Sequence, residues 1–356
     1  MIEVFKNVKI DWLANRRLFI AISVLLMLAG LGSAVARQWS PGGTDAFNLG
    51  IDFKGGTVVT ARFKQRPSAE DIRDALSATG IKDSVIQHVI DKPDTAIIKV
   101  PLQGSSEAQS QEQIDLGRSR VKAGLNQFGA EGDAYEIIGT DAVGAVAGAQ
   151  LRNKAIATTL AALVGILVYM AYRFEWTYGA AAVIAVFHDV LVTLGFFSIF
   201  QWEISLTVIA ALLTLVGFSV NDTIVVFDRI RENRRLHRRE SLYKITNDAI
   251  NQTLSRTAIT NGLVFLSVLA MVLFGGEVLR GFSLALLIGV IFGTYSSVAI
   301  ASPIMVWWEQ RLAAADKSSA AAVDRPTTSG SRVATASGRK PLAGPAVKRS
   351  RGAGRA

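Results

Sequence analysis

Long apolar stretches separated by polar connections dominate the pattern of this 356-residue chain. A membrane-spanning helix needs about 20 mostly apolar residues. Stretches of this kind cover residues 18–36, 155–172, 177–200, 204–227, 258–275 and 282–308. The first stands alone before a long polar block, and the other five follow one another closely. The pattern therefore predicts an α-helical polytopic membrane protein with six transmembrane helices, arranged as one plus five.

The polar block at 37–152 predicts a small folded α+β domain. Alternating apolar and polar residues predict strands at 57–63, 84–90, 95–102 and 134–138, with a turn at 91–94 between the middle two. Ser68, followed by two acidic residues, is typical of a helix start, and this helix is expected to end near Thr79. A second helix is expected at 107–128. The order β-α-β-β-α-β is the ferredoxin-like arrangement.

Lysine and arginine are concentrated in segments that would lie on one side of a membrane. The N-terminal segment 1–17 is basic, the connection 228–256 holds eight basic residues, and the tail 309–356 holds ten against three acidic ones. Loops on the other side contain only Arg280. Cytoplasmic loops carry the excess of positive charge. Both termini are therefore predicted to be cytoplasmic, with 37–152 in the periplasm and a five-helix bundle at 153–308.

Composition excludes several classes of function. The mean hydropathy is +0.33, the net charge is +9 and there is no Cys, which rules out disulfides, thiolate zinc sites and thiol nucleophiles. Most of the positive charge lies in the tail, which is expected to be disordered, and a nucleic-acid partner is not expected. No phosphate-binding loop and no zinc-protease or serine-hydrolase motif occurs. We expect no enzyme activity and no cofactor, with protons as the coupling ion.

An aspartate inside the fourth apolar stretch is the strongest functional candidate. Asp222 and the preceding Asn221 are candidates for proton coupling, and aliphatic residues lie on both sides of them in sequence. Burial in a low-dielectric medium disfavours a charged carboxylate, so proton uptake and release come within physiological reach. The alternative is a structural hydrogen bond to a neighbouring helix. We favour the functional interpretation because ionisable groups inside a membrane are costly.

Two further spans carry polar candidates. His188 and Asp189 lie near the middle of the third span, where they could relay protons or simply pair to lower the cost of burial. Adjacent residues point about 100° apart on a helix, so the two are not expected to share a face. In the fifth span, Arg256 and Thr260 begin a polar stripe. Arg256 could be a counter-charge for Asp222 or an interfacial arginine at the helix start.

Several motifs occur together in a recognisable order. They are NLGIDFKGGT at 48–57, His188-Asp189, VGFSVNDTIVVFDRIREN at 216–233, Ser255-Arg256-Thr257 and GTYSS at 293–297. In this order they resemble the SecF branch of the SecD/SecF family, within the resistance-nodulation-division superfamily. The resemblance covers roughly residues 1–312 of this chain.

The resemblance implies a subunit of a SecD–SecF complex in the bacterial inner membrane. Such a subunit uses the proton-motive force to help the SecYEG channel move unfolded preproteins, and its partners would be a SecD-like protein, SecYEG with other Sec accessory proteins, and membrane lipids. Asp222 matches the family's proton-carrying aspartate, Arg256 the arginine that controls it, and Thr260 a neighbouring polar position. Asp52, Gly55 and Gly56 form the periplasmic motif; we assign the glycines only a turn or a close backbone approach.

Two other functions remain as alternatives. The chain could be half of a proton-driven exporter of small molecules or lipids, although drug-exporting relatives usually carry two large exported subdomains in each half. It could also be a purely structural partner that organises SecD. In the second case Asp222 would be no more than a hydrogen-bonded side chain.

Overall fold

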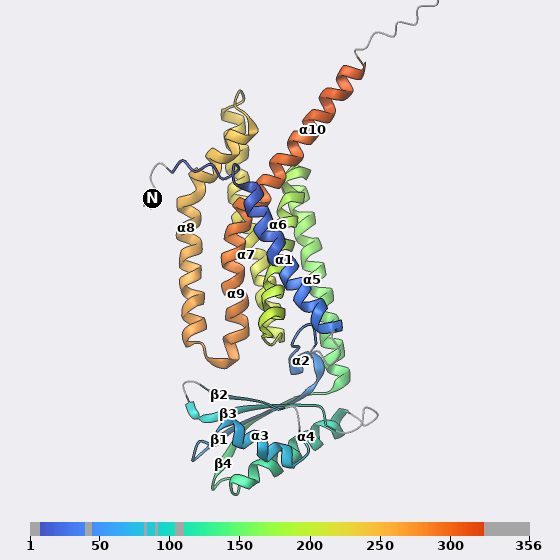
Figure 1. Cartoon of the computed structure of the whole chain (residues 1–356), viewed down its shortest axis with the longest axis vertical. Coiled ribbons are helices and arrows are strands. Elements are labelled where there is room, and N and C mark those ends of the chain that lie inside the picture. Colours follow the sequence, from blue (N-terminus) through green and yellow to red (C-terminus); the bar gives the residue numbers. More distant parts are fainter. Residues whose placement is uncertain (1–7, 40–44, 82–83, 90–91, 104–109, 324–356) are drawn as a thin grey trace, which may run out of the picture. The chain divides into compact units, whose positions relative to one another are not determined.

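The computed structural model describes residues 8–39, 45–81, 84–89, 92–103 and 110–323 (Figure 1). The chain divides into two units, Met1–Arg311 and Leu312–Ala356. Six spans in the described residues are long and apolar enough to cross a membrane. They are formed by helices α1 (Arg16–Trp39), α5 (Ala145–Arg173), α6 (Trp176–Phe200), α7 (Leu206–Leu236), α8 (Leu242–Phe274), and the pair α9 (Gly276–Ser296) and α10 (Ser302–Val323). The tail that was predicted to be disordered from residue 309 is helical as far as Val323, and its residues 324–356 lie outside the described residues.

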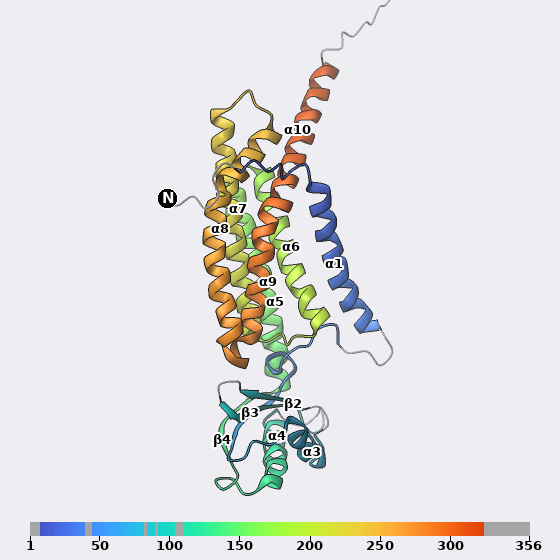
Figure 2. The same ribbon diagram turned by 60° about the vertical axis from the view of Figure 1, so that its left-hand side comes forward.

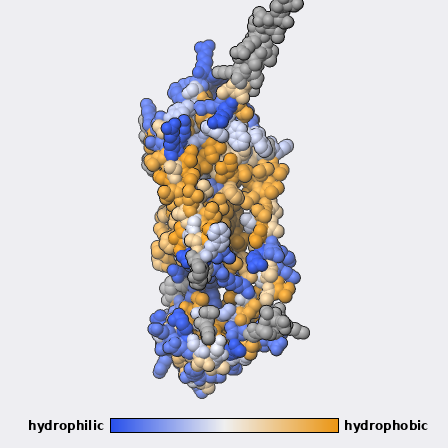
Figure 3. Space-filling view, turned by 45° about the vertical axis from the view of Figure 1, so that its right-hand side comes forward, coloured by the Kyte–Doolittle hydropathy of each residue, from blue (hydrophilic) through white to orange (hydrophobic). Residues whose placement is uncertain are grey.

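The helices pack side by side into a bundle, with α1 against α6 and α7 against α8 and α9 (Figures 1 and 2). On the face shown in Figure 3, a band of hydrophobic residues covers the bundle between two hydrophilic ends. Helices α6, α7 and the α9–α10 span are the most deeply enclosed, whereas few residues of the α1, α5 and α8 spans are fully buried. This distribution is that of a multi-pass membrane protein, in which the outer apolar side chains meet lipid or other membrane helices.

The polar block folds as the predicted ferredoxin-like domain. Its elements are β1 (Gly56–Phe63), α3 (Ala69–Ala78), β2 (Val85–Val89), β3 (Lys92–Pro101), α4 (Ser110–Leu125) and β4 (Tyr135–Val143). The four strands form one antiparallel sheet in the order β2-β3-β1-β4. Alternate residues of β1, among them Val59, Ala61 and Phe63, join Ile72 of α3 and Val121 of α4 in the core. The helices therefore cover one face of the sheet.

Several boundaries differ from the prediction. The predicted basic loop 228–256 is mostly helical, because α7 continues to Leu236 and α8 begins at Leu242. Hydropathy marks where a helix leaves the apolar layer, whereas arginine, lysine and glutamate are good helix formers that let it continue. For the same reason α5 begins at Ala145, inside the block predicted as 37–152 and ten residues before the span predicted at 155–172.

Three local features were not predicted. A short helix, α2 (Ile51–Lys54), lies within the glycine-rich motif. Strand β3 begins at Lys92, so most of the turn predicted at 91–94 belongs to a strand, and Asp91 lies outside the described residues. The predicted last span, 282–308, is interrupted by a π-helical turn at Ser297–Ala301. Such turns change the register of a helix and occur often at functional sites.

A capping box begins α3, as Ser68 and the acidic residues after it predicted. The Asp71 backbone N–H donates to the Ser68 hydroxyl, while the Ser68 backbone N–H and hydroxyl donate to the Asp71 carboxylate. These bonds, the hydroxyl first, hold the pKa of Asp71 below its ordinary value of 3.8. A carboxylate with a lowered folded pKa stabilises the fold above its unfolded pKa, and this contribution is lost as pH falls through the folded pKa.

We therefore expect Asp71→Ala to speed amide hydrogen exchange in α3 severalfold at neutral pH. The difference from the wild-type protein should shrink as pH falls below 3.8, where Asp71 itself becomes protonated. Exchange measured on the whole chain at a series of pH values tests this. Asp74→Ala, one turn into the same helix and outside the cap, is the control. If the difference in exchange rate between Asp71→Ala and the wild-type protein stayed the same in acid, the capping role of the Asp71 carboxylate would be contradicted.

Candidate functional site

Two aspartates are buried in the middle of the helix bundle. Asp222 of α7 is 4% exposed and Asp189 of α6 is 0% exposed. Both lie where the enclosed helices α6, α7 and α9 meet the π turn. A carboxylate in such surroundings is retained only if hydrogen bonds or a function compensate for the loss of water.

The Asp222 carboxylate accepts hydrogen bonds from two other membrane segments. Thr257 of α8 donates to Oδ1 at 3.1 Å, and Ser297, the first residue of the π turn, donates to Oδ2 at 2.9 Å. The Asn261 amide also lies beside this carboxylate. It donates to Thr294 of α9 at 2.7 Å. The charge state of Asp222 is thus linked to the packing of α7 against α8 and against the α9–α10 span.

The Asp189 carboxylate lies between α6, α7 and α9. It accepts from His188 Nδ1 at 2.9 Å, from Ser219 of α7 at 2.5 Å and from Ser296 of α9 at 2.7 Å. The bond between His188 and Asp189 was not expected from helix geometry, because adjacent residues of a helix do not share a face. The helical angle describes the Cα–Cβ directions, whereas the imidazole can turn toward its neighbour. His188 Nε2 is buried and has no partner among the described residues.

Neighbouring serines connect the two carboxylates. Ser296 binds Asp189, and the next residue, Ser297, binds Asp222. The π turn leaves the Ser297 carbonyl outside the regular α-helical ladder, and this oxygen accepts both the hydroxyl and the backbone N–H of Ser302. Ser302 therefore holds the Ser297 backbone with two hydrogen bonds next to the hydroxyl that meets Asp222.

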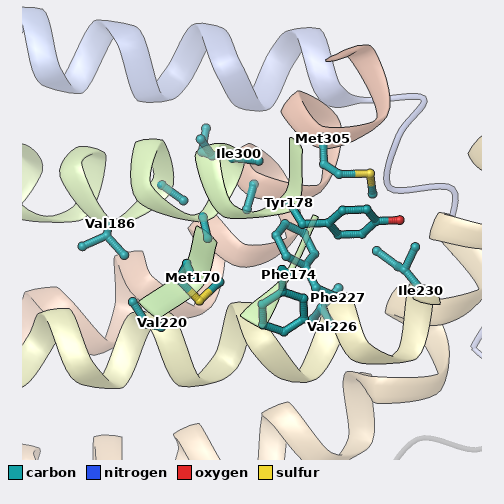
Figure 4. Packing of buried hydrophobic residues seen from close by; sticks show 14 of the residues in the cluster. Met170, Phe174, Tyr178, Val186, Val220, Val226, Phe227, Ile230, Ile300 and Met305 are labelled. Atoms are coloured by element: carbon teal, nitrogen blue, oxygen red, sulfur yellow. The ribbon is translucent and has the colours of Figure 1, made fainter. Parts of the chain in front are cut away.

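A hydrophobic cluster extends along α7 from Val216 and Val220, before Asp222, to Ile230 (Figure 4). Phe227 and Ile230 pack with Tyr178 of α6, Met305 of α10 and Leu13, which precedes α1. The rings of Tyr178 and Phe227 meet edge to face, with centroids 5.2 Å apart. The part of the cluster after Asp222 fills the bundle between Asp222 and the arginine-rich end of α7.

Three other predicted site residues lie on outer faces of the bundle. Asn221 is exposed on α7 and has no hydrogen-bond partner among the described residues. Arg256 is exposed on α8, and no described acidic group lies within 4 Å of it, although its charge still acts on Asp222 through space. Thr260 is exposed as well, and its hydroxyl bonds back to the Arg256 carbonyl at 2.9 Å. The predicted polar stripe therefore points away from Asp222 in this conformation.

Most of the hydrogen-bond donors to the aspartates were assigned no role from the sequence, although several lie within the motifs quoted above. They are Thr257, Asn261 and Ser297 beside Asp222, and Ser219 and Ser296 beside Asp189. One signal was available: Thr253, Thr257 and Asn261 recur every fourth residue and form the buried polar face of α8. The neighbouring stripe was the stronger candidate in the sequence because it contains the charged Arg256.

The glycine-rich motif binds the start of α7. The Asp52 carboxylate accepts from the backbone N–H of Leu206, the first residue of α7, at 2.8 Å. The Gly50 backbone N–H donates to the Ile204 carbonyl at 2.8 Å, and Lys99 of β3 pairs with Glu203. These contacts connect the ferredoxin-like domain to the helix that carries Asp222.

The two glycines of the motif fill the limited role that we assigned to them. Gly55 and Gly56 adopt φ angles of +79° and +150°. A Cβ on Gly55 would lie 2.7 Å from a Leu102 side-chain carbon, and one on Gly56 would lie 2.5 Å from the Val100 carbonyl oxygen. Only glycine fits this close approach without strain.

The fold and site together define a class of protein. Among the described residues, no group of three His, Cys, Asp or Glu side chains is placed to hold a metal ion. The centre of the bundle holds two buried carboxylates, groups that can gain and lose protons. The molecule is a membrane protein of one plus five spans with a ferredoxin-like domain after the first span.

Two family models match the chain. "Protein export membrane protein SecD/SecF, C-terminal" matches residues 125–311, and "SecD/SecF GG Motif" matches residues 43–65. The protein translocase subunit SecF of Koribacter versatilis is 40% identical, over 86% of this chain and 94% of its own length. That of Escherichia coli O157:H7 is 42% identical, over 74% of this chain and 79% of its own length.

A solved structure of similar fold is that of SecDF from Thermus thermophilus, described as a translocon-associated membrane protein. The TM-score is 0.71 at 36% sequence identity, and the match covers 85% of this chain but 39% of SecDF. The present chain thus spans well under half of that protein. The chain belongs to the SecF family of protein translocase subunits.

Proposed function

We propose that this chain forms a heteromeric complex with a SecD-like protein and uses the proton-motive force to assist SecYEG-dependent translocation of unfolded preproteins. The observation that carries the proposal is the buried Asp222 carboxylate, held by hydroxyl groups from two other membrane segments. A hydroxyl donates more strongly to a carboxylate than to a neutral carboxyl group. Protonation of Asp222 therefore loosens α7 from α8 and from the π turn, and deprotonation restores the contacts.

The length of the SecDF relative supports the SecD-like partner. This chain matches 39% of the solved SecDF chain, so a partner subunit would supply the remaining membrane helices. Exposed Arg256 and Thr260 lie on the face of α8 that such a partner could cover. In the complex, Arg256 would meet an acidic group of the partner and control Asp222 from there.

We place the protein in the bacterial inner membrane with both termini in the cytoplasm. The support is the excess of lysine and arginine near the N-terminus and around the α7–α8 connection. The ferredoxin-like domain is then periplasmic. Asp52, which binds the first residue of α7, would transmit movements of that helix to the domain. Protons serve as the coupling ion, without a further cofactor. Basic residues near the membrane would meet anionic lipid headgroups.

His188 and Asp189 keep two possible roles within this function. They could relay protons to or from Asp222, or hold neighbouring groups in place. The half-transporter of a small-molecule or lipid exporter remains the competing function. The single ferredoxin-like domain argues against it, because exporters of the superfamily usually carry two large exported subdomains in each half.

Export in cells tests the proposal. We expect cells that lack their own SecF subunit to process a reporter preprotein severalfold faster when they receive this chain and its SecD-like partner. An uncoupler should remove that stimulation, while the slower export without the chain changes less. Purification from membranes should also recover the SecD-like protein. Stimulation that survives the uncoupler, or purification with efflux partners alone, would contradict the proposal.

A further inference from the structure

Asp189 makes more contacts than the pairing with His188 requires. His188 Nδ1 occupies one carboxylate oxygen, and the hydroxyls of Ser219 and Ser296 both donate to the other. Gly293 lies just beside these groups: a Cβ there would be 3.3 Å from the Ser219 Cβ and 3.7 Å from Asp189 Oδ2. Three helices thus converge on a single carboxylate oxygen, and the small residue at 293 allows the approach.

Both serines held by Asp189 are adjacent to the Asp222 site. Ser219 lies on α7 one turn before Asp222, so it fixes the rotation of that helix where the carboxylate emerges. Ser296 immediately precedes Ser297, the hydroxyl donor to Asp222 Oδ2. Asp189 is thus connected to Asp222 through Ser219 on α7, and to Ser297 through Ser296 at the π turn. Asp222 and Ser297 are the two partners of one hydrogen bond.

We propose that Asp189 is a positioning residue for Asp222, holding Ser219 and Ser296 so that the Ser297 hydroxyl stays in contact with the Asp222 carboxylate. The inference rests on the proposed function, in which Asp222 carries the proton. It assigns the His188–Asp189 pair a fixed role: His188 holds the carboxylate in place, and the pair does not pass protons. The other charged group that acts on Asp222 is Arg256 on α8; the π turn contributes hydroxyl groups.

Infrared difference spectroscopy tests the inference on the SecD-bound protein in membranes. The carboxyl and carboxylate bands of Asp222 are identified by their loss in Asp222→Asn. In Ser296→Ala, which removes one hydroxyl and no charge, we expect the Asp222 carboxylate band to shift in frequency. The pH at half-protonation should change by about half a unit or more, the size expected when one hydrogen bond to the carboxylate is lost. Asp189→Asn should shift the same bands.

A matched control is available on α9. Ser283 is also fully buried, and its hydroxyl donates only to backbone carbonyls of its own helix, those of Leu279 and Arg280. Ser283→Ala should leave the Asp222 bands at their wild-type positions, and Ser296→Thr, which retains a hydroxyl, should restore them. Unchanged bands in Ser296→Ala and Asp189→Asn would overturn the inference.

The same spectra separate this inference from the proposed function. If Asp222 in the wild-type protein does not change protonation between pH 5 and 9, the proton-carrier function fails. The carboxylate band frequency at a single pH still tests whether Asp189 and Ser296 position Asp222. A proton that leaves protonated His188 and appears on Asp222, seen as loss of the imidazolium bands together with a rise of the Asp222 carboxyl band, would show a relay and would also overturn the inference.

Discussion

Replacing Asp222 by Asn is expected to reduce assisted export to the rate seen in cells that lack the subunit. Asparagine has nearly the same shape and can still accept hydrogen bonds from Thr257 and Ser297 through its amide oxygen. It cannot take up a proton at physiological pH. The rate of signal-peptide removal from a reporter preprotein measures the loss, in cells whose only SecF subunit is the variant.

The magnitude of the expected loss follows from the energy source. One charge moved across 100 mV is worth about 2.3 kcal/mol, and a carrier that cannot be protonated gains none of this energy. At about 1.4 kcal/mol for each factor of ten, the proton-driven step itself slows by up to some fortyfold, whereas the measured export rate falls only by the severalfold stimulation that the subunit provides.

The same helix offers a matched control. Asp228→Asn makes the identical change at an exposed carboxylate on α7, and export should stay near the wild-type rate. Membrane abundance and recovery of the SecD-like partner must be equal for the variants. Normal export by Asp222→Asn at normal abundance would show that Asp222 is only a structural hydrogen-bond acceptor.

Gly195→Leu is expected to prevent α1 from packing against α6. The helices meet at Gly30 and Gly195, where a Cβ on Gly195 would lie 3.0 Å from the Gly30 Cα and one on Gly30 only 2.5 Å from the Gly195 Cα. Backbone atoms cannot move aside as a side-chain end can. Small residues allow helices in membranes to approach closely, where van der Waals contact drives association.

The loss of stability should be large for a single substitution. Overpacking a well-packed core costs about 1–3 kcal/mol, and a leucine forced against backbone should reach or exceed the upper end. Abundance in membranes and the thermal midpoint in detergent measure the effect. Gly165→Leu is the control, since no atom lies within 4 Å of a Cβ built on that glycine of α5. Similar losses for both variants would indicate that leucine is harmful for another reason.

The contact of Gly30 with Gly195 also shows where prediction from sequence ends. Gly289 and Gly293 lie four residues apart on one helix, a spacing typical of helix packing in membranes, and a Cβ on Gly289 would lie 2.5 Å from a Leu215 side-chain carbon on α7. Gly30 and Gly195 lie on different helices, 165 positions apart. No local pattern marks them as a pair.

Asp222 could be found from sequence because its cost is a local property. Any carboxylate within an apolar span is expensive, wherever the neighbouring helices lie. Its hydrogen-bond donors could not be found in the same way. In the structure the hydroxyls of Thr257 and Ser297 donate to Asp222, whereas Asn221 and Thr260 lie on outer faces of the bundle. Which face of a helix turns inward depends on how it packs against its neighbours.

The sequence by itself determined the six spans, the ferredoxin-like order of the polar domain and the carboxylate at the centre. Each follows from hydropathy, alternation or local composition, which act over one helix or strand at a time. Only the tertiary structure decided that Asp189 and Asp222 are joined through Ser296 and Ser297, and that a π turn lies at their junction. The physical reason is that rotation and register between helices are set by contacts between distant segments, which no single segment encodes.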